Sequence, residues 1–383
     1  MDAVVIGGGI VGLSAAYYLG EAGANVTLYE KNSLGTGSTS RAAGGIRSQF
    51  STEVNVKLSM ASREVWERFE DSFGVDLAYR KPGYLFLAQT AEMADQFQQN
   101  VQMQNELGVD TELLTPEQAS EQCPGLLTDQ FTAATYNSTD GFADPNLAVQ
   151  GYASAARETG VDIQTNTAVT DVLTNGNTVI GVETADGVLS ADFVVNTAGA
   201  WAARIGEMAS VELPIRPRRR QIAVVEPSKP VAEDVPLTIN LETGSYFRPE
   251  RDGAALVGGY FDAEDPDADA DTYSESMDMA WAATAVEHAA EYTTYFGPNS
   301  RIRRGWAGLY AVTPDHHPII EETVPGFITA AGFSGHGFQH APATGQIVRD
   351  LCLSDSSTLV DVTPLSGRRF GDNDGGRVEQ NVA

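Results

Sequence analysis

The sequence has few lysines, few cysteines and no long hydrophobic run. Lysine occurs only at positions 31, 57, 81 and 229 of the 383 residues, and Lys plus Arg total 24 against 52 Asp plus Glu. The resulting net charge of −28 argues against non-specific nucleic-acid binding and against an anionic membrane surface. An acid excess with scarce lysine predicts a halophilic protein, and an ordinary acidic enzyme is the alternative.

The two cysteines argue against a redox dithiol and against a cysteine metal site. Cys123 and Cys352 lie far apart without a CxxC motif, so we expect both to be small buried apolar residues. His316 and His317 have no third ligand at metal-like spacing, and no metal site is predicted. No run of eighteen apolar residues occurs and the first residues lack a basic region, so we expect no transmembrane segment and a cytoplasmic location.

Glycine is abundant, and its placement at the N-terminus is informative. Gly7, Gly9 and Gly12 follow a short apolar strand (residues 3–6) and open a helix, and Glu30 ends the next apolar strand. These glycines allow a tight turn, close backbone approach to a pyrophosphate and close helix–strand packing. The helix N-terminus attracts phosphate, and an acid at position 30 can hold a ribose hydroxyl pair. The pattern predicts a dinucleotide site for NAD or FAD.

The order of elements predicts an α/β (α+β) fold with two domains. A discontinuous Rossmann-like dinucleotide-binding domain, which the resemblance described below implies to be FAD-binding, would comprise residues 1–80, 145–215 and 300–353. An inserted, mostly antiparallel β-sheet substrate domain would comprise 81–144 and 216–299, and 354–383 would form a surface tail. The expected helices are 53–73, 91–107, 145–159, 273–291 and one from Pro342 to about 353. Strands are expected at 83–88, 131–136, 161–165, 168–174, 178–184, 191–196, within 213–262 and within 301–330, with a solvated acidic loop at 262–271.

Four segments resemble the D-amino-acid oxidase superfamily of FAD enzymes, and within it the sarcosine oxidase and dimethylglycine dehydrogenase branch. They are the N-terminal fingerprint at residues 2–30, residues 37–47, residues 195–201 and the glycine turn 332–339, and the resemblance extends to about residue 353. It implies FAD held by Gly7, Gly9, Ile10, Val11, Gly12, Glu30, Lys31, Ser38, Thr39, Arg41, Ala43, Gly44, Gly45, Val169, Ala198, Gly199, Trp201, Gly332, Gly335, His336, Gly337, Phe338 and Gln339. An NAD dehydrogenase does not need the second, late glycine turn.

The late glycine turn has a physical role of its own. A flavin that accepts a hydride gains negative charge at its N1–C2=O edge. Backbone amides at Gly335 and Gly337 can stabilise that charge as an oxyanion hole does, aided by a helix opening near Ala341 and Pro342.

Two departures from the resembling families predict non-covalent FAD. Monomeric sarcosine oxidases attach flavin through a cysteine where Gly308 stands here. Dimethylglycine dehydrogenases attach it through a histidine in the early loop, where Arg41 stands nearest.

Other departures concern the substrate and the electron acceptor. Tyr310 replaces an arginine that holds the substrate carboxylate in glycine oxidase, and Gln339 replaces a second anchoring lysine of sarcosine oxidases. Arg47 remains as the candidate that grips the carboxylate, with a structural ion pair as its alternative. The strand at 254–260 lacks the oxygen-activating lysine of sarcosine oxidases, so oxygen is expected to be a poor acceptor. A dehydrogenase that passes electrons to a protein or quinone acceptor is therefore the alternative to an oxidase that uses oxygen.

The resemblance implies oxidation of a secondary or tertiary amino acid such as sarcosine, dimethylglycine or proline. Hydride would pass to flavin N5 and water would hydrolyse the imine, with Arg47, His336, Tyr310 and Tyr246 as candidate catalytic residues. His336 orients the substrate or only packs against flavin, and Tyr246 is a lid or wall. One alternative is a 2-hydroxy-acid dehydrogenase with His336 as base. Another is a flavoprotein subunit or assembly factor without turnover, which includes a possible partner subunit.

Overall fold

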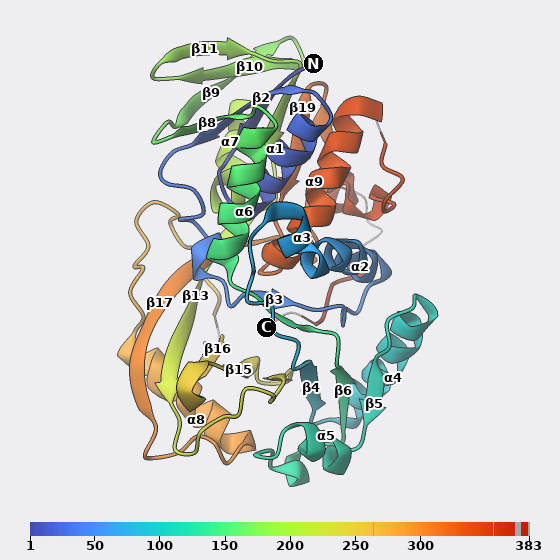
Figure 1. Cartoon of the computed structure of the whole chain (residues 1–383), viewed down its shortest axis with the longest axis vertical. Coiled ribbons are helices and arrows are strands. Elements are labelled where there is room, and N and C mark those ends of the chain that lie inside the picture. Colours follow the sequence, from blue (N-terminus) through green and yellow to red (C-terminus); the bar gives the residue numbers. More distant parts are fainter. Residues whose placement is uncertain (263, 355, 372–376, 382–383) are drawn as a thin grey trace.

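The N-terminal glycine turn follows β1 (Asp2–Ile6), an inner strand of the six-stranded sheet in the upper half of Figure 1. The structure, a computed structural model, describes residues 1–262, 264–354, 356–371 and 377–381. Five neighbouring strands are parallel and only β18 runs antiparallel, to β19. The sheet order is β18 (Ile319–Val324), β19 (Phe327–Ala331), β12 (Phe193–Asn196), β1 (Asp2–Ile6), β2 (Asn25–Glu30) and β8 (Asp162–Thr165).

Helices cover this sheet because its central strands are apolar on both faces, as in other parallel sheets. They are α1 (Ile10–Glu21), α6 (Pro145–Glu158), α7 (Ala202–Met208) and α9 (Gly337–Ser354). The packing of α1 on α9 is close: a Cβ at Gly345 would lie 2.3 Å from Ser14 Oγ. Trp66, on α2 (Glu53–Glu67), stacks on Phe338 with 5.0 Å between ring centroids. This packing fixes the first turn of α9.

An eight-stranded sheet forms the lower half of Figure 1. All its neighbouring strands pair antiparallel except β14 and β4. Its order is β17 (Arg301–Val312), β13 (Arg216–Glu226), β16 (Ala255–Gly259), β15 (Ser245–Pro249), β14 (Leu237–Asn240), β4 (Tyr84–Ala88), β6 (Ala133–Asn137) and β5 (Glu112–Leu114). The helices of this half are α4 (Ala91–Glu106), α5 (Pro116–Gln122) and α8 (Met279–Tyr292).

Smaller sheets complete the fold. Strands β9 (Val169–Asn175), β10 (Thr178–Thr184) and β11 (Gly187–Ser190) form an antiparallel sheet at the top of Figure 1. The two-stranded sheet pairs β3 (Gly45–Ile46) with β7 (Gly141–Phe142). The predicted fold class is confirmed. None of the described helices is both long enough and apolar enough to cross a bilayer.

Several predicted element limits differ from the structure. The helix predicted at 53–73 is divided at Arg68 into α2 and α3 (Phe69–Phe73). The helix predicted at 273–291 begins only at Met279, since the preceding residues pair with β13 side chains. The last helix begins at Gly337 and contains Pro342, because burial of this segment outweighs the single helical hydrogen bond that proline cannot donate. Strand β17 joins the eight-stranded sheet by pairing with β13, although residues 300–353 are assigned to the FAD-binding domain by the sequence prediction.

The expectation of a surface tail fails at Val360 and Leu365, which are buried in the hydrophobic core, and again at the far end of the tail. Glu379 is fully buried and Asn381 is 4% exposed, because polar groups of the loop before α2 need their oxygens as acceptors. Residues 372–376 and 382–383 of the predicted tail lie outside the described residues.

The acidic loop is also not simply solvated. Four aspartates pair with basic side chains of β13, of α7 and of the residue after β2. They are Asp265, Asp267, Asp269 and Asp271, and their partners are Arg204, Arg216, Arg218, Arg220 and Lys31.

Candidate active site

A cavity of ≈ 790 Å³ lies between the two large sheets. Its walls come from both ends of the chain, from Ile6 in β1 to Gln339 in α9. Every predicted cofactor-binding or catalytic residue lines it except Gly12. Because Gly12 belongs to the turn itself, its part is structural: a Cβ there would lie 1.9 Å from the Gly7 carbonyl oxygen.

The nucleotide turn forms one end of the cavity. Gly7 has φ +109°, a conformation that favours glycine, and its added Cβ would lie 2.7 Å from the Thr197 carbonyl oxygen. By contrast, an added Cβ at Gly9 would meet only Thr39 Oγ1, at 3.4 Å, so the cavity approaches the backbone there. The α1 N-terminus has no side-chain cap at Gly9, and the Ile10 amide donates to Thr39 Oγ1 at 3.2 Å. The glycine turn and the N-terminus of α1 that follows it therefore form a cradle that suits a pyrophosphate.

Acidic and basic side chains mark the same end. Glu30 accepts hydrogen bonds from the Gly8 and Asn32 amides, each at 2.8 Å, so its carboxylate is fixed at the cavity wall. Lys31 Nζ lies 3.6 Å from the Trp201 ring centroid. Asp271 accepts from Trp201 Nε1 at 2.7 Å, which brings the acidic segment to the cavity mouth.

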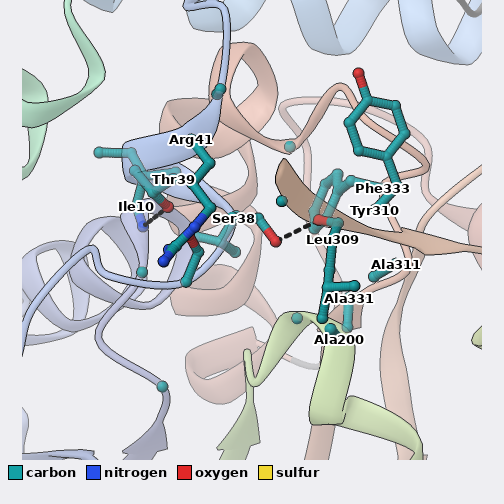
Figure 2. Close-up of a pocket in the computed structure, with 18 of the residues that line it drawn as sticks. Ile10, Ser38, Thr39, Arg41, Ala200, Leu309, Tyr310, Ala311, Ala331 and Phe333 are labelled. Atoms are coloured by element: carbon teal, nitrogen blue, oxygen red, sulfur yellow. Dashed lines mark hydrogen bonds between the residues drawn. The ribbon is translucent and has the colours of Figure 1, made fainter. Parts of the chain in front are cut away.

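The middle of the cavity lies where the early loop meets β17 (Figure 2). Ser38 donates through its hydroxyl to the Leu309 carbonyl at 2.6 Å, one of the two dashed contacts in Figure 2. On the same strand, an added Cβ at Gly308 would lie 2.9 Å from Arg41 Cβ. The two residues that replace flavin-attaching side chains in the resembling families therefore adjoin one another.

The late glycine turn closes another side. Gly332 and Gly335 have φ of +82° and +100°, and a Cβ at Gly335 would lie 2.3 Å from the Tyr310 ring. Helix α9 starts at Gly337, directly after this turn, so the helix N-terminus that faces the cavity is at Gly337 and not near Pro342. An edge that gains negative charge would meet both the turn amides and this positive helix end.

Three tyrosines and Arg47 lie in the part of the cavity that is lined by the eight-stranded sheet. Tyr84, Tyr246 and Tyr310 line the cavity. Burial raises the pKa of all three phenols above their ordinary value, most strongly that of Tyr246, so they are neutral hydrogen-bonding groups. Arg47 is 8% exposed, and its Cζ lies 3.9 Å from the Phe50 ring centroid.

Arg47 keeps its charge without a close counter-ion in the described part of the chain. Its guanidinium donates to the carbonyl oxygens of Gln49 and Asn381, and none of the ion pairs found within 4.0 Å includes it. Its backbone amide donates to Gln339 Oε1 at 2.7 Å, which ties the early loop to α9. Burial lowers the pKa of Arg47 from its ordinary value, although an arginine stays charged in proteins.

His336 belongs to a chain of neutral histidines. Burial lowers its pKa to about 3. Its Nε2 donates to the His316 carbonyl at 3.0 Å, because a carbonyl oxygen can only accept. Its Nδ1 is then an acceptor and lies 3.3 Å from Nδ1 of His340, which must donate. The Ser59 hydroxyl donates to His340 Nε2 at 2.9 Å. Both ring nitrogens of His336 are therefore engaged by the protein.

Sequence reasoning missed several cavity residues. Tyr84 is one of five buried residues of an apolar strand, so no sequence signal distinguishes it. Arg220 lies in the basic run 216–220, and its Cζ lies 4.3 Å from the Tyr260 ring centroid. Asp271 was predicted only as part of a solvated loop. The described residues contain no group of three or more His, Cys, Asp or Glu with a geometry that could hold a metal ion.

The fold, the nucleotide turn and the second glycine turn define a flavin-dependent oxidoreductase. The chain belongs to the FAD dependent oxidoreductase (DAO) family, which it matches over residues 2–351. A solved structure of L-proline dehydrogenase from P. horikoshii superposes with a TM-score of 0.87 at 35% identity and covers 97% of each chain. The predicted family and FAD as its cofactor are thus confirmed.

Two curated relatives add to this picture. Rat dimethylglycine dehydrogenase is 30% identical over 397 residues, which is 97% of this chain but only 45% of the rat protein. Sarcosine oxidase subunit beta of Arthrobacter sp is 29% identical and covers 96% of this chain and 91% of that protein. This chain therefore spans less than half of the dimethylglycine dehydrogenase it matches.

Proposed function

We propose that this protein oxidises the C–N bond of a secondary or tertiary amino acid such as sarcosine, dimethylglycine or proline. The observation that carries the proposal is Arg47, a buried cation at the cavity wall whose hydrogen-bond partners among the described residues are carbonyl oxygens. A substrate carboxylate would supply the missing negative charge and would bind the guanidinium as a charge-assisted pair. The named activities of the proline, dimethylglycine and sarcosine relatives support this substrate class.

The bound FAD would supply the redox chemistry, accepting the hydride from the substrate carbon. The protein residues bind and orient. Arg47 would hold the carboxylate, and the neutral phenols of Tyr246 and Tyr310 would wall the amine site without adding charge. No ionisable base is required when the amine binds in its neutral form, and the geometry around His336 does not offer one.

We propose that FAD is bound non-covalently. The two positions that carry attaching side chains in resembling families are Gly308 and Arg41, and neither has a suitable nucleophile. Cys123 and Cys352 are buried away from the cavity lining, and burial raises the pKa of each thiol to about 12. Acid precipitation should leave the yellow FAD in the supernatant. Flavin that stays with the precipitated protein would contradict this part of the proposal.

The hydroxy-acid alternative receives less support. It requires a base that takes the hydroxyl proton, and His336 was its candidate. The accepting nitrogen of His336 faces His340, and its pKa of about 3 makes it a weak base. Anaerobic reduction of the flavin by 2-hydroxyglutarate, without reduction by any amine, would favour this alternative.

The direct test is an anaerobic panel of substrates. The FAD-loaded protein is mixed with sarcosine, dimethylglycine, L-proline, D-alanine and 2-hydroxyglutarate, and loss of oxidised-flavin absorbance is followed. We expect reduction by at least one secondary or tertiary amino acid. Oxygen uptake with the same substrate then decides between an oxidase and a dehydrogenase with a protein or quinone acceptor. If none of these compounds reduces the flavin, adding a co-purified partner tests whether the chain is a subunit, as the sarcosine oxidase relative suggests.

A further inference from the structure

The carboxylate of Glu379 is an unusual feature near the cavity. It is fully buried, yet it lies beyond residue 351, where the match to the family ends. It accepts from the Ser51 amide at 2.8 Å, the Ser51 hydroxyl at 2.6 Å and the Thr52 hydroxyl at 2.6 Å. It also accepts from Asn55 Nδ2 at 3.0 Å and from the Asn381 amide at 3.1 Å. Burial alone would raise its pKa, but these donors outweigh burial and lower it.

The residues after Glu379 reach Arg47. The Gln380 amide donates to Ser51 Oγ at 2.9 Å, and Asn381 Nδ2 donates to the Gln49 carbonyl at 3.2 Å. The Asn381 carbonyl in turn accepts from Arg47 Nη2. Segment 379–381 thus runs beside loop 47–52 and supplies one of the two oxygens that hold the guanidinium.

A second buried carboxylate holds the other side of this loop. Asp140 accepts from the Ser48 amide at 2.8 Å and from Gln49 Nε2 at 3.2 Å. Neither Asp140 nor Glu379 lies within ion-pair distance of Arg47, but both raise its pKa through space. Each carboxylate is satisfied by neutral donors, so Arg47 is oriented without being neutralised.

We propose that Glu379 is a positioning residue of the amine site. It would anchor segment 379–381 against the start of α2, so that the Asn381 carbonyl holds Arg47 in the direction that a substrate carboxylate requires. This inference rests on the proposed function, in which Arg47 binds that carboxylate. Glu379 does not touch the substrate, and its effect is confined to ligands that carry a carboxylate.

The test compares an acid with its uncharged amide. Binding of 2-furoate, a carboxylate without an oxidisable C–N bond, and of 2-furamide is measured by calorimetry on the FAD-loaded protein and its E379Q variant. We expect the Kd for 2-furoate to rise roughly tenfold, which corresponds to about 1.4 kcal/mol, and the Kd for 2-furamide to stay unchanged. With an oxidised substrate, KM for proline should rise more than KM for prolinamide, while kcat changes less. Glu207→Gln, at an exposed position, is the matched control.

Other outcomes overturn the inference. Equal weakening of acid and amide would mean general damage, and unchanged 2-furoate binding would mean that Glu379 has no part in the site. If E379Q does not fold, Thr52→Val removes one donor to Glu379 and should weaken 2-furoate selectively, by a smaller factor. Wild-type protein that binds 2-furoate but oxidises no amine would end the proposed function and leave this inference to be judged by binding alone.

Discussion

Arg47 is a buried charge without an ion-pair partner among the described residues. Such a charge lowers the stability of the fold unless a bound ligand neutralises it. Isolating a charge from water is unfavourable, and only polar contacts or an opposite charge offset that cost. Carbonyl oxygens of Gln49 and Asn381 provide part of the compensation. A bound anion would supply the rest of the compensation. The site should therefore bind amines that carry a carboxylate more tightly than amines that lack one.

Replacing Arg47 by Met should separate substrate binding from cofactor binding. We expect KM for an amino-acid substrate to rise by roughly 10- to 100-fold, because a charge-assisted pair contributes about 1.5–3 kcal/mol. FAD content should stay at the wild-type level, as measured by the ratio of flavin to protein absorbance. Equal loss of FAD would assign Arg47 to structure, and an unchanged KM would remove it from the site.

The lowered pKa of His336 predicts how the free energy of unfolding depends on pH. Its pKa of about 3 in the folded protein lies below the ordinary value of 6.5, so the unfolded chain binds the proton more readily between these pH values. The stability that depends on neutral His336 is present above pH 6.5 and is lost as pH falls toward 3. Between about pH 6.5 and about pH 5 the loss would be about 2 kcal/mol.

His336→Asn should therefore flatten the decline of Tm below pH 6.5, followed by calorimetry between about pH 5 and about pH 7.5. His288→Asn, which removes a histidine at a partly exposed position on α8, is the matched control. Asp140 acts in the opposite direction, because burial raises its pKa to about 6, but it is the same in all variants. Parallel Tm curves for wild type and His336→Asn would contradict this reading of the histidine chain.

At the scale of elements, the sequence predicts best where local pattern and tertiary demand agree. The unit β1–turn–α1–β2 is found as expected because apolar strands and glycines meet both demands. Helix α9 starts earlier than Pro342 implies, since packing of Phe338 on Trp66 is a long-range contact. The burial of Glu379 could not be foreseen either. Hydropathy places an acid on the surface, and four of its five donors come from residues more than 300 positions away.

The cavity residues also divide into those that local sequence pattern predicts and those that depend on long-range packing. Glycines and the residues beside them were predictable because each glycine motif has a backbone requirement. Tyr84 and Arg220 were not, because their place in the cavity depends on how the strands of the eight-stranded sheet pair.

The turn between β1 and α1 allows a sharp test. Gly12→Ala would bring a Cβ to 1.9 Å from the Gly7 carbonyl oxygen, so the turn must open. We expect FAD affinity to fall by roughly 100-fold, about 2.7 kcal/mol, as measured by reconstitution of the apoprotein. Gly23 follows the same helix and has φ +82°, with nothing within 4 Å of an added Cβ. The Gly23→Ala variant is therefore a control that measures the effect of backbone strain without a steric clash. Similar loss in both variants would contradict the assigned role of the turn.

At the scale of the whole molecule, the net charge of −28 is distributed unevenly. Seven of the 24 basic residues pair with the acidic stretch between Asp265 and Asp278: Lys31, Arg41, Arg204, Arg216, Arg218, Arg219 and Arg220. The rest of the chain is left with a larger excess of acid. Most of these pairs are partly exposed, so each contributes only about 0–1 kcal/mol.

Added salt should therefore stabilise the protein. Screening weakens the exposed pairs, but it also weakens repulsion among the many unpaired acids, and we expect the second effect to be larger. Tm should rise between about 0.1 M and about 1 M KCl. A Tm that falls over this range would mean that the ion pairs dominate, and it would argue against the halophilic prediction.

The cavity walls run from Ile6 to Gln339, almost the full length of the chain. During synthesis, the glycine turn that would bind the phosphates is made with the first three strands. The residues on the opposite side of the cavity, in β17 and the late glycine turn, are made much later. The site is complete only after Gln339 has emerged, so flavin capture comes after the folding of both large sheets. Riboflavin supply during expression should consequently govern the yield of folded protein, since a ligand that binds only the finished fold draws newly made chains toward it.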